Sequence, residues 1–311
     1  MKVKKPKFWD YKRPNILSYL LAPFTFPIIL NNLFRKTNNT KNQNIKTICI
    51  GNIYIGGTAK TPLTIKLYNI LKKLDYKVAT IKKYYANQND ENKLLSRDTH
   101  FYNLNTRSNS LNKAIKDNIK VAIFDDGLQD KTINYDLSFV CFNNDSGIGN
   151  GFLIPAGPLR ENLNSIKNYD GVFLNGNEED TSHFKKLIEK YNANIKIFET
   201  YYLPTNIKEF DQSNGYLIFS GIGNPSTFKK TLTKHKLNIV KTIEFPDHYQ
   251  YTKKDIEKIK LQAKHLNAKI LTTEKDFVKI TDLDCAEIKF LKVDLVIKQE
   301  DKLINFIESK L

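Results

Sequence analysis

The stretch Gly56-Gly57-Thr58-Ala59-Lys60-Thr61-Pro62 decides the fold. It follows an apolar, β-branched run, KTICIG at residues 46–51, and precedes a run with helical spacing of apolar residues at 61–74. A glycine-rich turn between a strand and a helix directs backbone N–H groups and the helix N-terminus at a phosphate. We therefore predict a nucleotide-binding P-loop at Gly56, Gly57, Thr58, Ala59, Lys60 and Thr61, in which Lys60 neutralises the β- and γ-phosphates and Thr61 ligates Mg²⁺.

Ala59 occupies the position at which the usual motif has a glycine next to the lysine. A Cβ at this point crowds the approach of the backbone to a phosphate. Two alternatives therefore stay open. One is a nucleotide-binding protein with reduced or no catalytic activity, and the other is a strand-to-helix turn with a structural role alone.

A pair of acidic residues ends the next buried strand. Residues 121–124 are apolar and run into Asp125-Asp126-Gly127-Leu128-Gln129. A DDG sequence alone is more often a turn, but two carboxylates at a strand end beyond a P-loop suit a hard cation. We predict that Asp125 and Asp126 bind Mg²⁺ together with Thr61.

Strands and helices alternate along the rest of the chain. Further strands are expected at 76–81, 137–142 and 171–174, with helices at 111–118 and 183–191. A second block has expected strands at 215–220, 240–245, 269–272 and 288–293, and helices at 226–235, 253–266 and 302–311. The pattern predicts an α/β fold: a mostly parallel P-loop sheet with helices on both faces, plus a smaller C-terminal α/β domain. The polar stretch around 204–213 separates a P-loop domain at 37–205 from the smaller domain at 206–311.

The first 36 residues form a segment of their own. Its apolar run at 16–30 is too short to span a bilayer and contains Pro23 and Pro27, which break a helix. We interpret residues 1–36 as a membrane-associating segment. Its aromatic residues at the headgroup level would be Trp9, Tyr11, Tyr19, Phe24 and Phe26. Its flanking cations are Lys2, Lys4, Lys5, Lys7, Lys12, Arg13, Arg35 and Lys36. The alternative is a helical hairpin packed on the core.

The charge balance suggests a membrane partner rather than a nucleic acid. The 49 Lys and Arg residues outnumber the 33 Asp and Glu residues, so the net charge is +16. Only five of the 49 are Arg, and the Lys are spread along the chain, which favours solvated faces over a nucleic-acid site. We expect an anionic membrane surface, and no nucleic acid, as a partner.

Six motifs occur in an order that closely resembles the tetraacyldisaccharide 4'-kinases of lipid A biosynthesis. The resemblance runs from about residue 46 to residue 279. The motifs are GN with GGTAKTP at 51–62, DDGLQ at 125–129, LIPAGPLRE at 153–161, FSGIGNPSTF at 219–228, FPDH at 245–248 and TTEKDFVK at 272–279.

The resemblance implies an enzyme, a phosphotransferase with an alcohol group as acceptor. Its substrates would be ATP and a lipid-linked disaccharide, the tetraacylated glucosamine disaccharide 1-phosphate, which receives the phosphate on its 4'-hydroxyl. The family also implies a RecA-like P-loop domain joined to a smaller α/β domain, with the active site in the cleft between them. It further implies a location at the cytoplasmic face of the inner membrane of a Gram-negative bacterium, as a peripheral or monotopic protein.

Family roles carry over where the motifs match. Asp90 with Glu91 resembles the family's DEPxLL motif, whose Asp is the proposed general base, and His248 resembles its partner histidine. Gln129, Arg160 and Glu161 are expected to bind substrate. The planar guanidinium of Arg160 suits a phosphate, although an ion pair with Glu161 is an alternative.

The sequence departs from the family pattern at three further places. Asp130 stands where the family usually has His, Lys82-Lys83-Tyr84-Tyr85-Ala86 replaces SRGYG, and the segment before Asp90 is shortened. Residues 273–276, TEKD, are interpreted as a helix-start cap.

Overall fold

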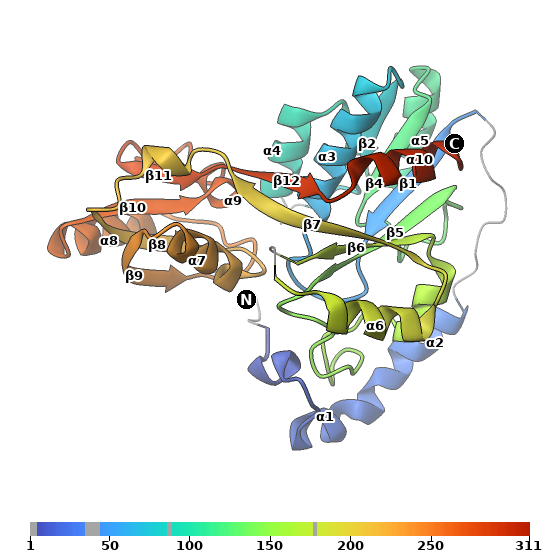
Figure 1. Cartoon of the computed structure of the whole chain (residues 1–311), viewed down its shortest axis with the longest axis horizontal. Helices are drawn as coiled ribbons and strands as arrows, with labels where there is room; N and C mark the ends of the chain where they lie inside the picture. The colour runs from blue at the N-terminus through green and yellow to red at the C-terminus, as the bar shows by residue number, and fades with distance from the viewer. Residues whose placement is uncertain (1–4, 35–43, 86–88, 177–178) are drawn as a thin grey trace.

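Eight strands form the larger of two sheets, in the order β12-β7-β6-β5-β1-β4-β2-β3 (Figure 1). The computed structural model describes residues 5–34, 44–85, 89–176 and 179–311. The strands of this sheet are β1 (Lys46–Gly51), β2 (Val78–Ile81), β3 (Phe101–Tyr102), β4 (Val121–Asp125), β5 (Leu137–Asn143), β6 (Gly171–Asn175), β7 (Lys196–Pro204) and β12 (Val293–Ile297). All pairings are parallel except that of β12 with β7.

Helices cover both faces of this sheet, because its strands are apolar on both sides. One face packs on α3 (Lys60–Lys73) and α10 (Glu300–Glu308). The other face packs on α5 (Arg107–Lys116), α6 (Ser182–Tyr191) and the 3₁₀ helix η3 (Leu163–Asn168). Helix α4 (Asn89–Asp98) lies beside α3 and carries charged residues toward the second sheet.

The second sheet is smaller and entirely parallel, in the order β11-β10-β8-β9. Its strands are β8 (Gly215–Ser220), β9 (Asn238–Glu244), β10 (Ala268–Thr273) and β11 (Ile288–Leu291). Helix α7 (Pro225–Lys234) packs on one face, and α8 (Lys253–His265) with α9 (Glu274–Phe277) packs on the other. The predicted fold class, a P-loop α/β sheet with a smaller α/β domain, is confirmed.

The end of the chain corrects the predicted domain boundary. We expected residues 206–311 to form one unit, but β12 and α10 return to the larger sheet. The cause is β7, a strand that the sequence analysis did not predict and that β12 covers along its free edge. Leu303 and Ile307 of α10 then complete the core on the α3 face. The smaller unit is therefore an insertion between β7 and β12.

The N-terminal segment folds as η1 (Lys7–Asp10), α1 (Ile16–Leu21), η2 (Ala22–Thr25) and α2 (Phe26–Phe34). Trp9 is buried, contrary to expectation, because its Nε1–H donates to the Pro155 carbonyl oxygen at 3.0 Å. Tyr11, Tyr19, Phe24 and Phe26 are exposed. The predicted cations Lys2, Lys4, Arg35 and Lys36 lie outside the described residues, as does Ala86.

Polar contacts help to hold these helices to the body, beside an edge-to-face contact of Tyr19 with Phe152. Ser18 is fully buried, and its Oγ accepts a hydrogen bond from Asn150 Nδ2 at 2.8 Å. Asn32 Nδ2 donates to the Arg160 carbonyl oxygen at 3.1 Å. Within the described ranges, no helix is long and apolar enough to cross a membrane.

Candidate active site

The predicted P-loop connects β1 to α3. Asn52, buried just beyond β1, donates from Nδ2 to Thr58 Oγ1 at 3.0 Å and so fixes the turn. Ala59 has a φ of 63° and caps α3, so it adopts the left-handed conformation that glycine normally supplies. The loop therefore has its expected place at the N-terminus of a helix, with a backbone that a side-chain-bearing residue rarely takes.

Thr61 and Asp125 meet beneath this loop. Thr61 Oγ donates to Asp125 Oδ2 at 2.9 Å, and Lys82 Nζ lies 2.8 Å from the same oxygen. Asp125 is fully buried, and its second oxygen, Oδ1, has no hydrogen-bond partner among the described residues. A buried carboxylate oxygen beside a threonine hydroxyl is a donor set that fits a hard cation.

Asp126 turns away from β4 with a φ of 57° and faces the loop lysine. Its Oδ1 lies 3.8 Å from Lys60 Nζ and 3.0 Å from Arg160 Nη1. Burial by itself would raise the pKa of this carboxyl, but Lys60 and Arg160 lower it to about 2. The two cations therefore keep Asp126 ionised.

The three predicted substrate residues form one connected group. Arg160 Nη1 donates to Gln129 Oε1 at 3.2 Å, and Gln129 Nε2 donates to Glu161 Oε1 at 2.9 Å. Glu161 also accepts from Tyr169 Oη at 2.8 Å. The ion-pair partner of Arg160 is Asp126 and not the neighbouring Glu161, so the arginine is held toward the P-loop.

Asp90 and His248 come from different domains and meet at the interface. Asp90 lies in the first turn of α4 and is fully buried, whereas His248 follows β9 and is 19% exposed. His248 Nδ1 is 2.9 Å and 3.0 Å from the two carboxylate oxygens of Asp90. Burial would raise the pKa of Asp90, but the hydrogen bond to His248 and the charge of Lys275 lower it to about 2.

Three lysines that the sequence analysis did not select complete this cluster. Lys82 is buried and bridges Asp125 to Glu91, whose Oε2 is 2.6 Å away. Lys275 Nζ lies 3.3 Å from Glu91 Oε1 and 3.5 Å from Asp90 Oδ2. Lys279 Nζ pairs with Asp276 Oδ1 at 2.5 Å and lies 3.9 Å from Asp90 Oδ2.

The positions of these lysines in sequence explain why they were missed. Lys275 belongs to the stretch that was interpreted as a cap, and Thr273 Oγ1 does accept from Asp276 N at 3.1 Å. The structure has the predicted cap, but in the same turn Lys275 also reaches across the interface to Glu91 of α4. Charge pairing raises the pKa of Lys82 and of Lys275 against the effect of their burial.

Arg107 is a further residue that sequence reasoning missed. Its Nη1 lies 3.1 Å from Asp130, the residue that departs from the family pattern, and its Nη2 donates to the Asp126 carbonyl oxygen at 2.5 Å. It is buried, so the guanidinium fixes the turn that carries the acidic pair. Arg is scarce in this chain, and this scarcity was the reason for selecting Arg160. The same reasoning would have selected Arg107.

The smaller domain also touches the P-loop directly. A Cβ on Gly57 would lie 3.2 Å from Asn224 N, and a Cβ on Gly223 would clash with Gly57 N. The two glycines thus let the backbones of the two domains approach each other. The P-loop, the acidic pair and the Asp90–His248 pair consequently lie at one interface.

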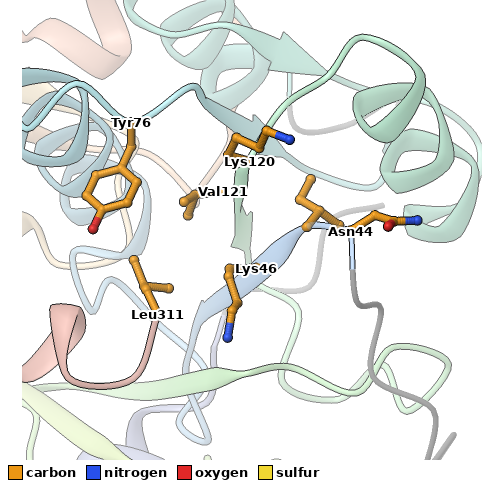
Figure 2. Close-up of a pocket in the computed structure, with 7 residues that line it drawn as sticks. Asn44, Lys46, Tyr76, Lys120, Val121 and Leu311 are labelled. Atoms are coloured by element: carbon orange, nitrogen blue, oxygen red, sulfur yellow. The ribbon is translucent and has the colours of Figure 1, made fainter.

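A cavity of about 370 Å³ lies elsewhere (Figure 2). It is found at the amino ends of β1 and β4, at the opposite end of the sheet from the P-loop. Its lining includes Asn44, Lys46, Tyr76, Lys120, Val121 and Leu311. It holds none of the predicted site residues.

Known proteins resemble this chain over nearly its whole length. The family model of tetraacyldisaccharide-1-P 4'-kinases matches residues 17–311. A tetraacyldisaccharide 4'-kinase of Pelagibacter ubique is 52% identical over 305 residues, which cover 98% of this chain and 97% of that protein. One of Rickettsia bellii is 34% identical, covering 93% of this chain and 94% of that protein.

A solved structure has the same fold. LpxK from Aquifex aeolicus, crystallised in complex with ATP, matches with a TM-score of 0.67 and 21% identity. The match covers 94% of this chain and 99% of the crystallised chain.

Proposed function

The chain belongs to the tetraacyldisaccharide-1-P 4'-kinase family, and from this premise we propose that it transfers the γ-phosphate of ATP to the 4'-hydroxyl of a tetraacylated glucosamine disaccharide 1-phosphate. The observation that carries the proposal is the meeting of three groups at one interface. They are Lys60 of the P-loop, Asp126 at the end of β4, and the Asp90–His248 pair. Phosphoryl transfer depends chiefly on positioning and on charge stabilisation, which this arrangement supplies.

The nucleotide binds on the P-loop in this proposal. Backbone N–H groups of residues 56–61 and the N-terminus of α3 hold the phosphates, and Lys60 neutralises the group in transfer. Thr61, Asp125 and Asp126 would hold Mg²⁺, with the unpartnered Oδ1 of Asp125 as the free buried oxygen. When bound, the ion would neutralise charge between the β- and γ-phosphates.

The Asp90–His248 pair accepts the proton of the 4'-hydroxyl. Asp90 is inaccessible to solvent and touches Nδ1 of His248 with both oxygens, so a sugar hydroxyl reaches the pair from the histidine side. The carboxylate orients the imidazole and stabilises its positive charge.

The acceptor sugar lies near Gln129, Arg160 and Glu161. The guanidinium of Arg160 donates to both Asp126 and Gln129, so it is held beside the acidic pair, while the backbone carbonyl of Arg160 contacts the N-terminal helices. We assign these three residues to binding of the phosphorylated disaccharide. The scarcity of arginine in this chain supports a requirement for its planar donor geometry.

The exposed apolar side chains of the N-terminal helices support a peripheral membrane location. Ile16, Leu17, Tyr19, Leu20, Phe24 and Phe26 face solvent while Ser18 and Thr25 face the protein. This pattern is the reverse of a helix packed on a core, and it suits the boundary between headgroups and acyl chains. We propose that these helices bring the enzyme to the cytoplasmic face of the inner membrane of a Gram-negative bacterium, where the acyl chains of the substrate remain.

Transfer of radiolabelled γ-phosphate from ATP to the purified disaccharide lipid tests the function. We expect a labelled 4'-phosphate product, and Lys60→Ala should lower turnover by about 10²–10³-fold, as removal of a comparable electrostatic group does. Asp90→Asn and His248→Ala should each lower it without abolishing ATP binding.

Equal product from the wild-type protein and Lys60→Ala would contradict the kinase assignment and favour a nucleotide-binding protein without this activity. Stimulation of ATP hydrolysis by DNA or RNA would contradict the proposed absence of a nucleic-acid partner.

A further inference from the structure

Asn175 is a buried amide to which none of the roles above applies. It ends β6 and is 1% exposed. Neither its Oδ1 nor its Nδ2 has a hydrogen-bond partner within the described residues. Folded proteins pair almost all buried side-chain polar atoms, so an amide with both ends unpaired points to a partner that the protein itself does not supply.

The position of Asn175 places it on the P-loop face of the sheet. Phe173, two residues earlier on β6, belongs to the same core cluster as Leu63 and Leu67 of α3. Because side chains alternate along a strand, Asn175 lies on that same face. Two strand spacings, about 10 Å, separate β6 from the P-loop strand β1.

The orientation of the nucleotide follows from the side of β1 on which the residues proposed for phosphate transfer lie. Strands β4 and β2 lie on one side, and with them Asp126, Lys82 and the Asp90–His248 pair. The γ-phosphate therefore points toward that side. The nucleoside end must extend the other way, across the carboxyl ends of β5 and β6, where Asn175 lies.

The smaller domain covers these strand ends. Lys230 of α7 lies 2.7 Å from Asp145, in the loop after β5, and 3.2 Å from Glu179, in the segment after β6. The two domains therefore meet over the carboxyl ends of β5 and β6. Exclusion of water there strengthens hydrogen bonds to an amide.

We propose that Asn175 recognises the base of the nucleotide, accepting at Oδ1 from the 6-amino group of adenine and donating from Nδ2 to a ring nitrogen. A carboxamide presents one acceptor and one donor side by side, which complements an adenine edge. The inference rests on the proposed use of ATP and extends it to the residue that contacts the base.

A double-mutant cycle between Asn175 and the 6-amino group tests the contact. Binding of ATP and of purine riboside triphosphate, which lacks that amino group, is measured by calorimetry for the wild-type protein and for Asn175→Ala. We expect loss of the amino group to weaken wild-type binding by at least about tenfold and to have almost no further effect on Asn175→Ala. Binding of tripolyphosphate should be the same in both proteins.

Asn143→Ala is the matched control, because Asn143 is the cross-strand neighbour of Asn175 in register and is also buried. Its Oδ1 already accepts from Asp145 N at 2.9 Å, so this variant should keep the wild-type preference for the 6-amino group. An equal effect of the amino group in wild-type protein and Asn175→Ala would overturn the inference and leave the amide a structural group that binds a buried water.

The near-isosteric Asn175→Asp keeps the test valid if the alanine variant does not fold. A carboxylate only accepts hydrogen bonds, so it should weaken ATP binding and favour GTP, whose base edge carries two adjacent donors. An unchanged ratio of ATP to GTP affinity would also overturn the inference. Failure of the wild-type protein to bind ATP would defeat it together with the proposed function, whereas binding without phosphate transfer would defeat only the kinase assignment.

Discussion

Ala59 holds a backbone conformation that its own side chain disfavours. An L-residue in the left-handed region costs about 1–2 kcal/mol relative to the right-handed one, and Ala59 has a φ of 63° at the start of α3. Contacts around the P-loop hold it there, including the Asn52–Thr58 hydrogen bond. The usual glycine of the motif would take the same conformation without this cost.

Ala59→Gly should therefore raise the free energy of unfolding by about 1 kcal/mol, the relief of strain exceeding the extra entropy of the unfolded chain. ATP binding should remain at least as tight, because the backbone gains freedom to approach the phosphates. Urea unfolding and ATP titration measure the two effects.

Ala114→Gly, in the last turn of α5, is the control and should lower stability by about 1 kcal/mol. A loss of stability in Ala59→Gly of the same size as in the control would contradict the presence of strain.

Single residues also show how far sequence reasoning reaches into the site. The P-loop and the acidic pair follow strands, so spacing alone predicted them. Lys82 and Lys275 were not selected, because both pair with Glu91 of α4, and Lys275 does so only through the contact between α4 and α9. The Asp90–His248 contact joins residues 158 positions apart, and its prediction came from resemblance to a family rather than from any local pattern.

At the scale of elements, the N-terminal helices are amphipathic, but it is their polar face that contacts the protein and their apolar face that is exposed. Their small polar residues dock on the loop at 149–160, while their large apolar residues are exposed. Trp9 is part of the docking contact and not of the exposed surface. Deletion of residues 1–36 would therefore disturb the loop that carries Arg160, and point substitutions give a cleaner test of membrane contact.

The double substitution Leu20→Ser and Phe24→Ser should lower the affinity for anionic vesicles at least about tenfold. Each large side chain contributes about 1.5–3 kcal/mol when it is removed from water. Both side chains are 65% exposed, so the fold should be unaffected. Sedimentation with vesicles measures the loss, and KM for the lipid should rise while Kd for ATP stays the same.

Leu261→Ser, at a 57% exposed position of α8 in the smaller domain, provides the control and should sediment as the wild-type protein does. Undiminished sedimentation of the double variant would mean that the membrane contact lies on another surface.

At the scale of the whole molecule, α4 and the region of α9 join the two domains by charge. Arg97 Nη2 lies 3.0 Å from Glu274, and Lys93 Nζ donates to the Val278 carbonyl oxygen at 3.1 Å. Asp90 and Glu91 of α4 face Lys275 from the other domain. These contacts hold His248 against Asp90, so the Asp90–His248 pair exists only where the two domains meet.

Stability should fall as this charge cluster is protonated. The folded pKa of Asp90, about 2, lies below its ordinary value of 3.8, so its contribution of about 2 kcal/mol is complete above about pH 5 and is lost as the pH falls toward 2. Asp126, also lowered to about 2, and Glu91, lowered too, add to the same acid limb.

Urea unfolding between pH 6 and pH 3 measures this dependence, and Asp90→Asn should show a shallower loss than the wild-type protein. Parallel pH profiles for the two proteins would contradict an ionised Asp90 held by the opposite domain.

The fold as a whole was predictable from alternation of strands and helices, except at its edge. Strand β7 lies where the sequence is polar and aromatic, KIFETYYLP, and its pattern does not mark it as a sheet strand. Its partner strand β12 was not predicted either, and helix α10 was therefore assigned to the smaller domain. Edge strands depend on pairing between distant segments, which local periodicity does not report.

The return of β12 and α10 to the larger sheet also sets the order in which the protein can be completed during synthesis. The chain emerges from the ribosome N-terminus first, at about 5–20 residues per second, and domains generally fold as units. The smaller domain is continuous and can fold once residue 292 has emerged. The nucleotide-binding domain needs Leu295, Ile297, Leu303 and Ile307 for its core, and so it can close only after these residues have emerged. A nascent chain that ends before these residues therefore already carries the P-loop and the acidic pair, but it lacks the finished sheet that positions them.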